Sequence, residues 1–172
     1  MDSSTTIQLQ LIDEVSRLLS PAHIPHWLFG GWSVDFLVGS VTREHGDIEF
    51  FIWEHDSPRA REQLQDSGYQ LVEHPHPDEA LIWRKHEQLV ELYFLAVNER
   101  GEVNGRGRWD NWALPENSLG GEIRGVDGVR CPVVSIECIL NTKLEYLQHT
   151  GIPPRDRDRA DVMALRRALG DF

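Results

Sequence analysis

Hydrophobic residues recur at two different periods along the chain, and the changes of period predict the order of its elements. Between residues 4 and 19 the apolar positions follow a helical stripe, which predicts a helix that Pro21 ends. Residues 26–29 form a short apolar run typical of a buried strand, and a helix closed by Gly39 follows it. Residues 47–53 are rich in β-forming residues and predict a central strand.

The rest of the chain continues with a helix, several strands and two final helices. Ser57 is expected to be the N-cap of a helix that runs to residue 67, because Pro58 follows it and Gly68 lies just past the end. The later elements are predicted to be a strand at 69–73, two strands within 80–97, a polar loop at 98–118, a hairpin turning at Asp127-Gly128, a helix from Ser135 to about 149 and a helix at 156–169. This order predicts an α/β (α+β) domain with a mixed β-sheet flanked by helices, followed by a small C-terminal helical region.

Composition and charge narrow the function. The sequence has 172 residues, 40% of them hydrophobic and 26% charged, which is ordinary for a globular domain. The net charge of −11 argues against a nucleic-acid partner and favours cationic ligands or metal ions, although solubility alone would also explain it. Two cysteines, Cys131 and Cys138, do not suggest a disulfide framework. No signal peptide and no membrane-spanning run is visible, so we expect a cytoplasmic protein.

Two carboxylates stand on one face of the strand predicted at 47–53. Residues i and i+2 of a strand share a face, so Asp47 and Glu49 lie about 6.6 Å apart along it. Such a pair is costly among apolar residues unless it binds a cation, and carboxylate oxygens are the ligands that Mg²⁺ prefers. The alternative is that both residues sit near an exposed edge of the strand.

Gly30 and Gly31 lie between a predicted strand and a predicted helix. Glycine there lets a phosphate approach the backbone, and the free N–H groups of a helix start attract an anion. A tight turn would explain the same pair. Because the carboxylate strand follows directly, a phosphate cradle and a metal site would be neighbours, as a displacement at phosphorus requires.

A third acid stands on a later strand. Glu91 falls on the same strand face as Tyr93 and Leu95, so it either faces water or has a chemical purpose. If it joins the first two acids, it could bind a metal or act as general base toward an acceptor hydroxyl.

The run of residues 27–53, WLFGGWSVDFLVGSVTREHGDIEFFIW, closely resembles the signature of the small antibiotic nucleotidyltransferases. These are the aminoglycoside 2″-adenylyltransferases and the lincosamide nucleotidyltransferases of the DNA polymerase β superfamily. Their pattern is a strand with Trp, Gly-Gly-Trp, a helix with Asp, and Thr-Arg-x-His-x-Asp-(Ile/Leu)-Asp. The segments VEL at 90–92, KLEYL at 143–147 and RDRDRADV at 155–162 are similar to later parts of the family.

The resemblance implies a nucleotidyltransferase domain at 1–134 and a helical region at 135–172 packed on it. It also implies transfer of a nucleoside monophosphate from an NTP, with ATP the expected donor, to a hydroxyl of a small and possibly cationic acceptor. Gly30 and Gly31 would hold the triphosphate, and Arg43 and Lys143 would neutralise it, although Arg43 could equally form a surface ion pair. Three acids would bind Mg²⁺ and take part in catalysis: Asp47, Glu49 and Glu91.

The sequence departs from the family pattern where Glu49 and Glu91 replace Asp. Each Glu adds a methylene group, and a misplacement of about 1 Å can cost on the order of 100-fold in rate. Two other functions therefore stay open. One is a protein-modifying adenylyltransferase of a toxin–antitoxin pair, and the other is a degenerate nucleotide-binding protein without activity. His45 is expected to be structural rather than catalytic.

Overall fold

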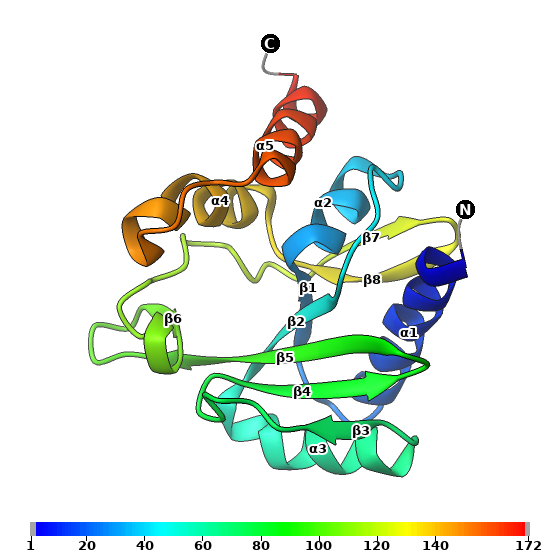
Figure 1. Cartoon of the computed structure of the whole chain (residues 1–172). Coiled ribbons are helices and arrows are strands. Elements are labelled where there is room, and N and C mark those ends of the chain that lie inside the picture. The colour runs from blue at the N-terminus through cyan, green and yellow to red at the C-terminus, as the bar shows by residue number, and fades with distance from the viewer. Residues whose placement is uncertain (1–2, 171–172) are drawn as a thin grey trace.

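The computed structural model describes residues 3–170 and places eight strands in one mixed sheet (Figure 1). The strand order is β3-β4-β5-β2-β1-β8-β7, and β6 pairs with β5. The strands are β1 His26–Phe29, β2 Ile48–Trp53, β3 Gln70–Val72, β4 Ala80–Lys85, β5 Gln88–Val97, β6 Val103–Gly105, β7 Glu122–Val126 and β8 Val129–Val133. The helices are α1 Ser3–Leu19, α2 Gly30–Val38, α3 Ser57–Asp66, α4 Ile136–Thr150 and α5 Asp156–Leu169.

Parallel and antiparallel pairs alternate across the centre of the sheet. β2 runs antiparallel to β1 and parallel to β5, and β1 runs parallel to β8. The remaining pairs are antiparallel. The expected α+β fold with a mixed sheet is confirmed.

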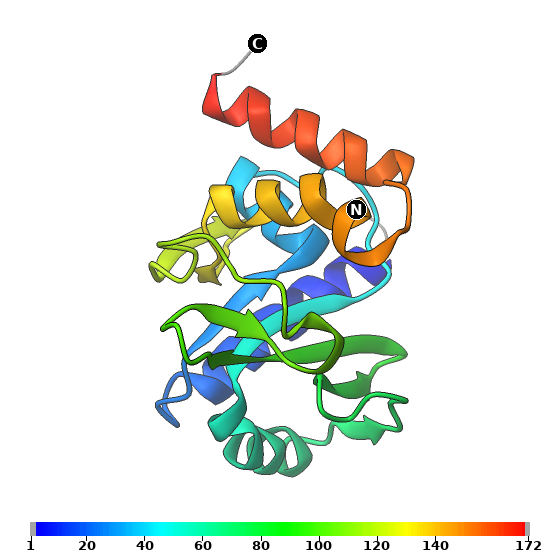
Figure 2. The same cartoon turned by 90° about the vertical axis from the view of Figure 1, so that its left-hand side faces the viewer.

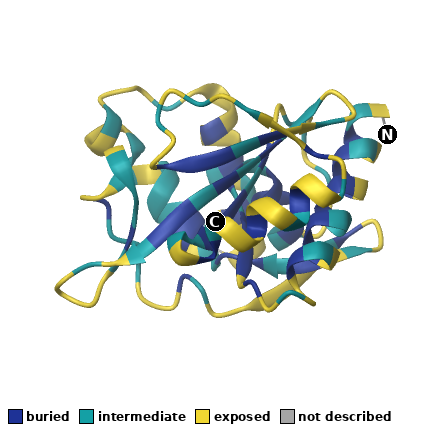
Figure 3. Ribbon diagram, turned by 90° about the horizontal axis from the view of Figure 1, so that it is seen from below, coloured by how far each residue is buried: buried dark blue, intermediate teal, exposed yellow. Residues whose placement is uncertain are grey.

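Alternate residues of the central strands feed two hydrophobic clusters on opposite faces of the sheet. Phe50 and Ile52 of β2 belong to a cluster that includes residues of α1 and α3. Phe51 points to the other face and joins residues of α4 and α5. Figure 2 shows α4 and α5 over this second face. In Figure 3 the strands at the centre of the molecule are buried and the peripheral loops are exposed. Any side chain on β2 that points to the same side as Phe51 therefore lies beneath the C-terminal helices.

Local signals at the ends of several elements act as the sequence predicts. Gly39 ends α2 with a left-handed φ of 85°. Ser135 caps α4, because its hydroxyl accepts a hydrogen bond from the backbone N–H of Cys138. Asp127 and Gly128 both have positive φ angles and join β7 to β8 in a two-residue turn.

Two expectations about local structure are wrong. Ser57 is inside α3 rather than its N-cap, because a 3₁₀ turn at Glu54–Asp56 runs directly into the helix and leaves Asp56 at the cap position. The segment 98–118 is not one long loop. It contains β6 and a 3₁₀ turn at Gly107–Trp109, because the chain folds back to pair with the end of β5.

No helix within residues 3–170 is both long enough and apolar enough to cross a membrane. The division of the chain at residue 134 stays a prediction. α4 and α5 pack against α2 as well as against each other, so the C-terminal helices cover the start of the Gly-Gly helix.

Candidate active site

The parallel pairing of β2 with β5 brings two of the predicted acids together. Glu49 and Glu91 are direct partners in the register of these strands. Glu49 is two residues before Phe51 and points to the same side of β2. The carboxylates of Glu49 and Glu91 therefore lie on the sheet face that α4 and α5 cover. Asp47 immediately precedes β2 and is exposed. The three acids named from the sequence therefore gather at one end of the central strand pair.

The Glu49 carboxylate lies against the Gly-Gly step. Gly30 has a φ of +64°, and a Cβ built on it would fall 1.6 Å from Oε2 of Glu49. The backbone N–H of Gly31 donates a hydrogen bond to the same carboxylate. Position 30 thus has neither the backbone conformation nor the space for a side chain. The N–H group expected to face a phosphate faces the Glu49 carboxylate in this structure.

The acids disfavour one another's ionisation. Loss of water around Glu49, together with the nearby charges of Asp47 and Glu91, raises the pKa of Glu49 to about 8, although Lys143 opposes the shift. Desolvation also raises the pKa of Glu91, although a hydrogen bond from Tyr93 opposes it. A cluster of carboxylates that repel one another in this way is stabilised by an added cation.

Glu49→Gln is expected to stabilise the metal-free protein at alkaline pH. The pKa of Glu49 is about 8 in the fold against an ordinary value of 4.5 in the unfolded chain, so the folded chain keeps a proton that the unfolded chain releases between these two values. The stability that this proton contributes is complete below pH 4.5 and is lost as the pH rises through 8. After an allowance for solvent screening, the variant should gain about 1–2 kcal/mol in free energy of unfolding at pH 8.5 and little at pH 5.

Urea denaturation with a chelator present, at pH 5 and pH 8.5, measures this difference. Glu62→Gln on the exposed face of α3 is the matched control, because it removes a carboxylate far from the acids. An equal effect of Glu49→Gln at both pH values would mean that the acids do not interact in the fold.

The donor chemistry of the acids suits Mg²⁺, since all three side chains offer hard carboxylate oxygens. In residues 3–170, however, no three His, Cys, Asp or Glu side chains come close enough together to hold a metal ion as they stand. The Glu49 carboxylate is turned toward Gly30 and Gly31. Metal binding by this set therefore requires Glu49 to rotate, and the metal ligands stay a prediction.

One buried carboxylate of α5 holds the two predicted phosphate-binding cations. Asp161 is 2% exposed. It accepts a hydrogen bond from Nη2 of Arg43 at 2.9 Å and lies 2.7 Å from Nζ of Lys143. Asp158 lies 3.3 Å from the same Nζ. Burial would raise the pKa of Asp161, but the two cations dominate and lower it. Arg43 is therefore part of a buried network rather than a surface ion pair.

A second buried network fixes the other side of Arg43. The Asp35 carboxylate is fully buried in α2 and accepts hydrogen bonds from the backbone and hydroxyl of Thr42. Nε2 of His45 lies 2.6 Å from Asp35, and Nδ1 lies 2.9 Å from Nη1 of Arg43. A Cβ at Gly31 would fall 2.5 Å from His45 and 2.6 Å from Arg43. His45 thus orients Arg43 against the Gly-Gly step, in line with its expected structural role.

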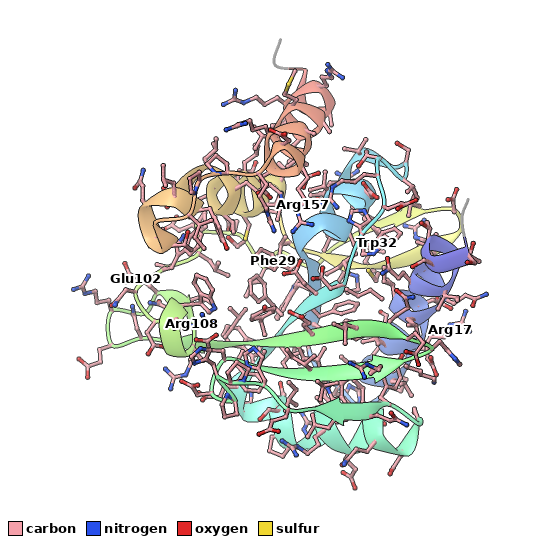
Figure 4. All side chains as sticks on the ribbon, in the orientation of Figure 1. Arg17, Phe29, Trp32, Glu102, Arg108 and Arg157 are labelled. Atoms are coloured by element: carbon pink, nitrogen blue, oxygen red, sulfur yellow. The ribbon has the colours of Figure 1, made fainter. Side chains whose placement is uncertain are left out.

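A pocket of about 160 Å³ joins these parts. It brings together six of the seven residues named from the sequence, Gly30, Gly31, Arg43, Asp47, Glu49 and Lys143, whereas Glu91 lies outside its lining. Figure 4 shows Phe29, at the end of β1, and Arg157, at the start of α5, on the two sides of this region. The further polar lining residues on α4 and around the start of α5 were not among the predicted site residues; they are Thr142, Tyr146, Arg155, Arg157 and Asp158. Thr142 and Tyr146 are four residues apart on α4, a helical spacing that could have indicated a second functional face.

The family model of the aminoglycoside-2″-adenylyltransferases matches residues 11–165. The chain belongs to this family. Its members are nucleotidyltransferases, and the match spans the Gly-Gly step, the acids, all of α4 and most of α5. The resemblance in the sequence of residues 27–53 is confirmed.

The chain is similar to relatives that are named for two different antibiotic classes. A lincosamide resistance protein of Staphylococcus haemolyticus is 26% identical over 145 residues, which are 83% of this chain and 84% of that protein. A 2″-aminoglycoside nucleotidyltransferase of Klebsiella pneumoniae is 39% identical over 44 residues, which are 26% of this chain and 25% of that protein.

Solved structures share the fold. ANT(2″)-Ia in complex with adenylyl-2″-tobramycin superposes with a TM-score of 0.76 at 19% identity, covering 95% of this chain and 90% of that one. The lincomycin-bound lincosamide adenylyltransferase LnuA gives a TM-score of 0.67 at 20% identity, covering 90% and 94%.

Proposed function

We propose that the protein transfers AMP from ATP to a hydroxyl of a small antibiotic-like molecule, with Mg²⁺ held by Asp47, Glu49 and Glu91. The observation that carries the proposal is the contact between the Gly-Gly step and the acid cluster. The Glu49 carboxylate lies against Gly30, and Glu91 is its partner on the next strand. A phosphate at the Gly-Gly step and a base for the attacking hydroxyl would then be neighbours.

Each residue of the site has a separate role in an in-line displacement. The carboxylate of Glu91 takes the proton of the acceptor hydroxyl, whose oxygen forms a bond to the α-phosphorus as the bond to the β-phosphate oxygen breaks. Pyrophosphate leaves with that electron pair. Arg43 and Lys143 offset the negative charge of the phosphates. When bound, Mg²⁺ would supply further charge neutralisation at the phosphate oxygens.

The longer acid at position 49 is compatible with this role. Gly30 carries no Cβ and gives the extra methylene of Glu49 the space to place its carboxylate beside the backbone. The departure from Asp is therefore accommodated in the metal-free fold, and Glu49 has to rotate away from the glycine step before it can bind Mg²⁺. A cytoplasmic location, where ATP and Mg²⁺ are both abundant, is part of the proposal.

Pyrophosphate release tests the proposal. The protein is incubated with ATP, Mg²⁺ and a panel of aminoglycosides and lincosamides, and products are examined by mass spectrometry. The expected result is pyrophosphate together with an acceptor heavier by one adenylyl group, with neither formed when a chelator is added. ATP binding by calorimetry without turnover of any panel member would contradict the proposal and favour a nucleotide-binding protein. Labelling of a protein by ATP instead of the panel would also contradict it.

A further inference from the structure

A second pocket, of about 240 Å³, opens beside the first. Aromatic and aliphatic side chains form most of its wall, among them Phe29, Phe51, Phe94, Trp109, Trp112 and Leu114. They come from β1, β2, β5 and the segment 98–118. Trp109 and Trp112, both in the segment 98–118, line this cavity.

The two pockets meet at the reacting position. Both are lined by Phe29 and Glu49, and by residues of α4. Phe51 follows Glu49 by two residues on β2, and Tyr93 follows Glu91 by two residues on β5, so each lies on the same strand face as its acid. A molecule in the second pocket would therefore place its near end at the acids, opposite a triphosphate in the first. That is the position of the acceptor.

The charges of the second pocket do not suit a polycation. Among its lining residues in the described chain, Glu49 is the one carboxylate, and Arg155 adds a positive charge that is paired with Asp158. An aromatic ring attracts a single ammonium group. Several ammonium groups, however, would lose their water against apolar walls with one carboxylate to pair with. Apart from the acids at its near end, this pocket therefore carries little of the net charge of −11.

The wall of this pocket is held in place by contacts on both sides. Trp112 stacks on His149 of α4, with ring centroids 4.2 Å apart and an interplanar angle of 11°. Arg108 forms a two-pronged ion pair with the buried carboxylate of Glu79, at 2.7 and 2.8 Å. These contacts fix the position of the pocket wall on both sides.

We propose that the second pocket binds an acceptor that carries a continuous apolar surface next to its reactive hydroxyl and at most one ammonium group. An amphiphilic sugar amide has this chemistry, whereas a polyamine oligosaccharide does not. The inference rests on the proposed function for the identity of the pocket as the acceptor site.

Calorimetry with two probes tests the inference. Lincomycin has one basic amine and an alkyl group, whereas tobramycin carries many amines and no alkyl chain. Each is titrated into the protein with Mg²⁺ and a non-hydrolysable ATP analogue. We expect lincomycin to bind at least about tenfold more tightly, which corresponds to about 1.4 kcal/mol.

Two tryptophan variants locate the binding site. Trp109→Ala removes a half-buried ring from the pocket and should weaken lincomycin binding at least about fivefold. Trp53→Ala removes a half-buried ring that packs edge-on against Trp27 outside both pockets, and should leave lincomycin affinity within about twofold. Leu114→Glu adds a carboxylate to the wall of the pocket and should reduce the difference in affinity between lincomycin and tobramycin.

Each result distinguishes the inference from the proposed function. Tighter binding of tobramycin, or no binding of lincomycin, overturns the inference even if tobramycin is adenylylated and the proposed function stands. If Trp109→Ala weakens the ATP analogue instead of lincomycin, the pocket holds the nucleobase and the inference is wrong. If lincomycin binds and depends on Trp109 but no AMP is transferred to it, the inference holds and the proposed function fails.

Discussion

Asp47→Asn is expected to lower kcat/KM for AMP transfer at least about 1000-fold, equivalent to about 4 kcal/mol. Asn keeps the shape of Asp but removes a negative charge from the acid cluster, and that charge is needed to hold Mg²⁺. Because Asp47 is exposed ahead of β2, the variant should fold normally. Removing its charge should also lower the pKa of Glu49, because Asp47 contributes to the rise in that pKa.

Steady-state rates with the preferred acceptor measure the loss of kcat/KM. Urea denaturation at several pH values measures the stability of the variant and the change in the pKa of Glu49. Asp66→Asn, at the exposed end of α3, is the control for a generic loss of acidic charge and should keep full activity. If Asp47→Asn retained more than about a tenth of the wild-type rate, Asp47 would not be a metal ligand. A variant that lost activity and stability together would point to a structural role instead.

Asp35→Asn is expected to lower the free energy of unfolding by about 3 kcal/mol. Arg43 can only donate hydrogen bonds, so Nδ1 of His45 must accept, and the His45 proton resides on Nε2. That proton points at Asp35, which lies 2.6 Å away. An Asn side chain has one amide oxygen and one NH₂ group in place of the two carboxylate oxygens. Its NH₂ group would face either the N–H of His45 or the donors of Thr42, so a buried donor would lose its acceptor in either orientation.

Thermal and urea denaturation of Thr42→Val provides the matched comparison. This variant removes only the hydroxyl that donates to Asp35, and it should cost about 1 kcal/mol. A similar cost for both variants would show that the His45 contact is not satisfied in the fold. Because His45 orients Arg43, Asp35→Asn should also raise KM for ATP in the fraction that remains folded.

The elements of this fold could largely be predicted because the signals that define them are local. Hydrophobic periods, Gly39, Ser135 and the Asp127-Gly128 turn each act within a few residues. The errors fall where tertiary contacts decide. β6 exists because Val103–Gly105 pairs with a strand nearby in space, and its own sequence is polar and rich in turn-forming residues.

The candidate site follows the same division. The acids and the Gly-Gly step could be predicted because the alternation of side chains along a strand and short sequence motifs indicate them. The partner of Arg43 and Lys143 could not, because Asp161 lies 118 residues after Arg43 and resembles its neighbours in an Arg- and Asp-rich helix. Only the packing of α5 over α2 distinguishes it from Asp156, which is fully exposed and pairs with Arg159.

Gly30 and Glu49 share a single volume, and this limits how the site can evolve. A side chain at position 30 would overlap the Glu49 carboxylate, and a shorter acid at position 49 would withdraw from the backbone that it now touches. Neither residue can change in size without disturbing the other. An exchange of this Glu for Asp would therefore open a gap beside the glycine step, whereas any side chain at position 30 would have to displace the acid and adopt a strained backbone.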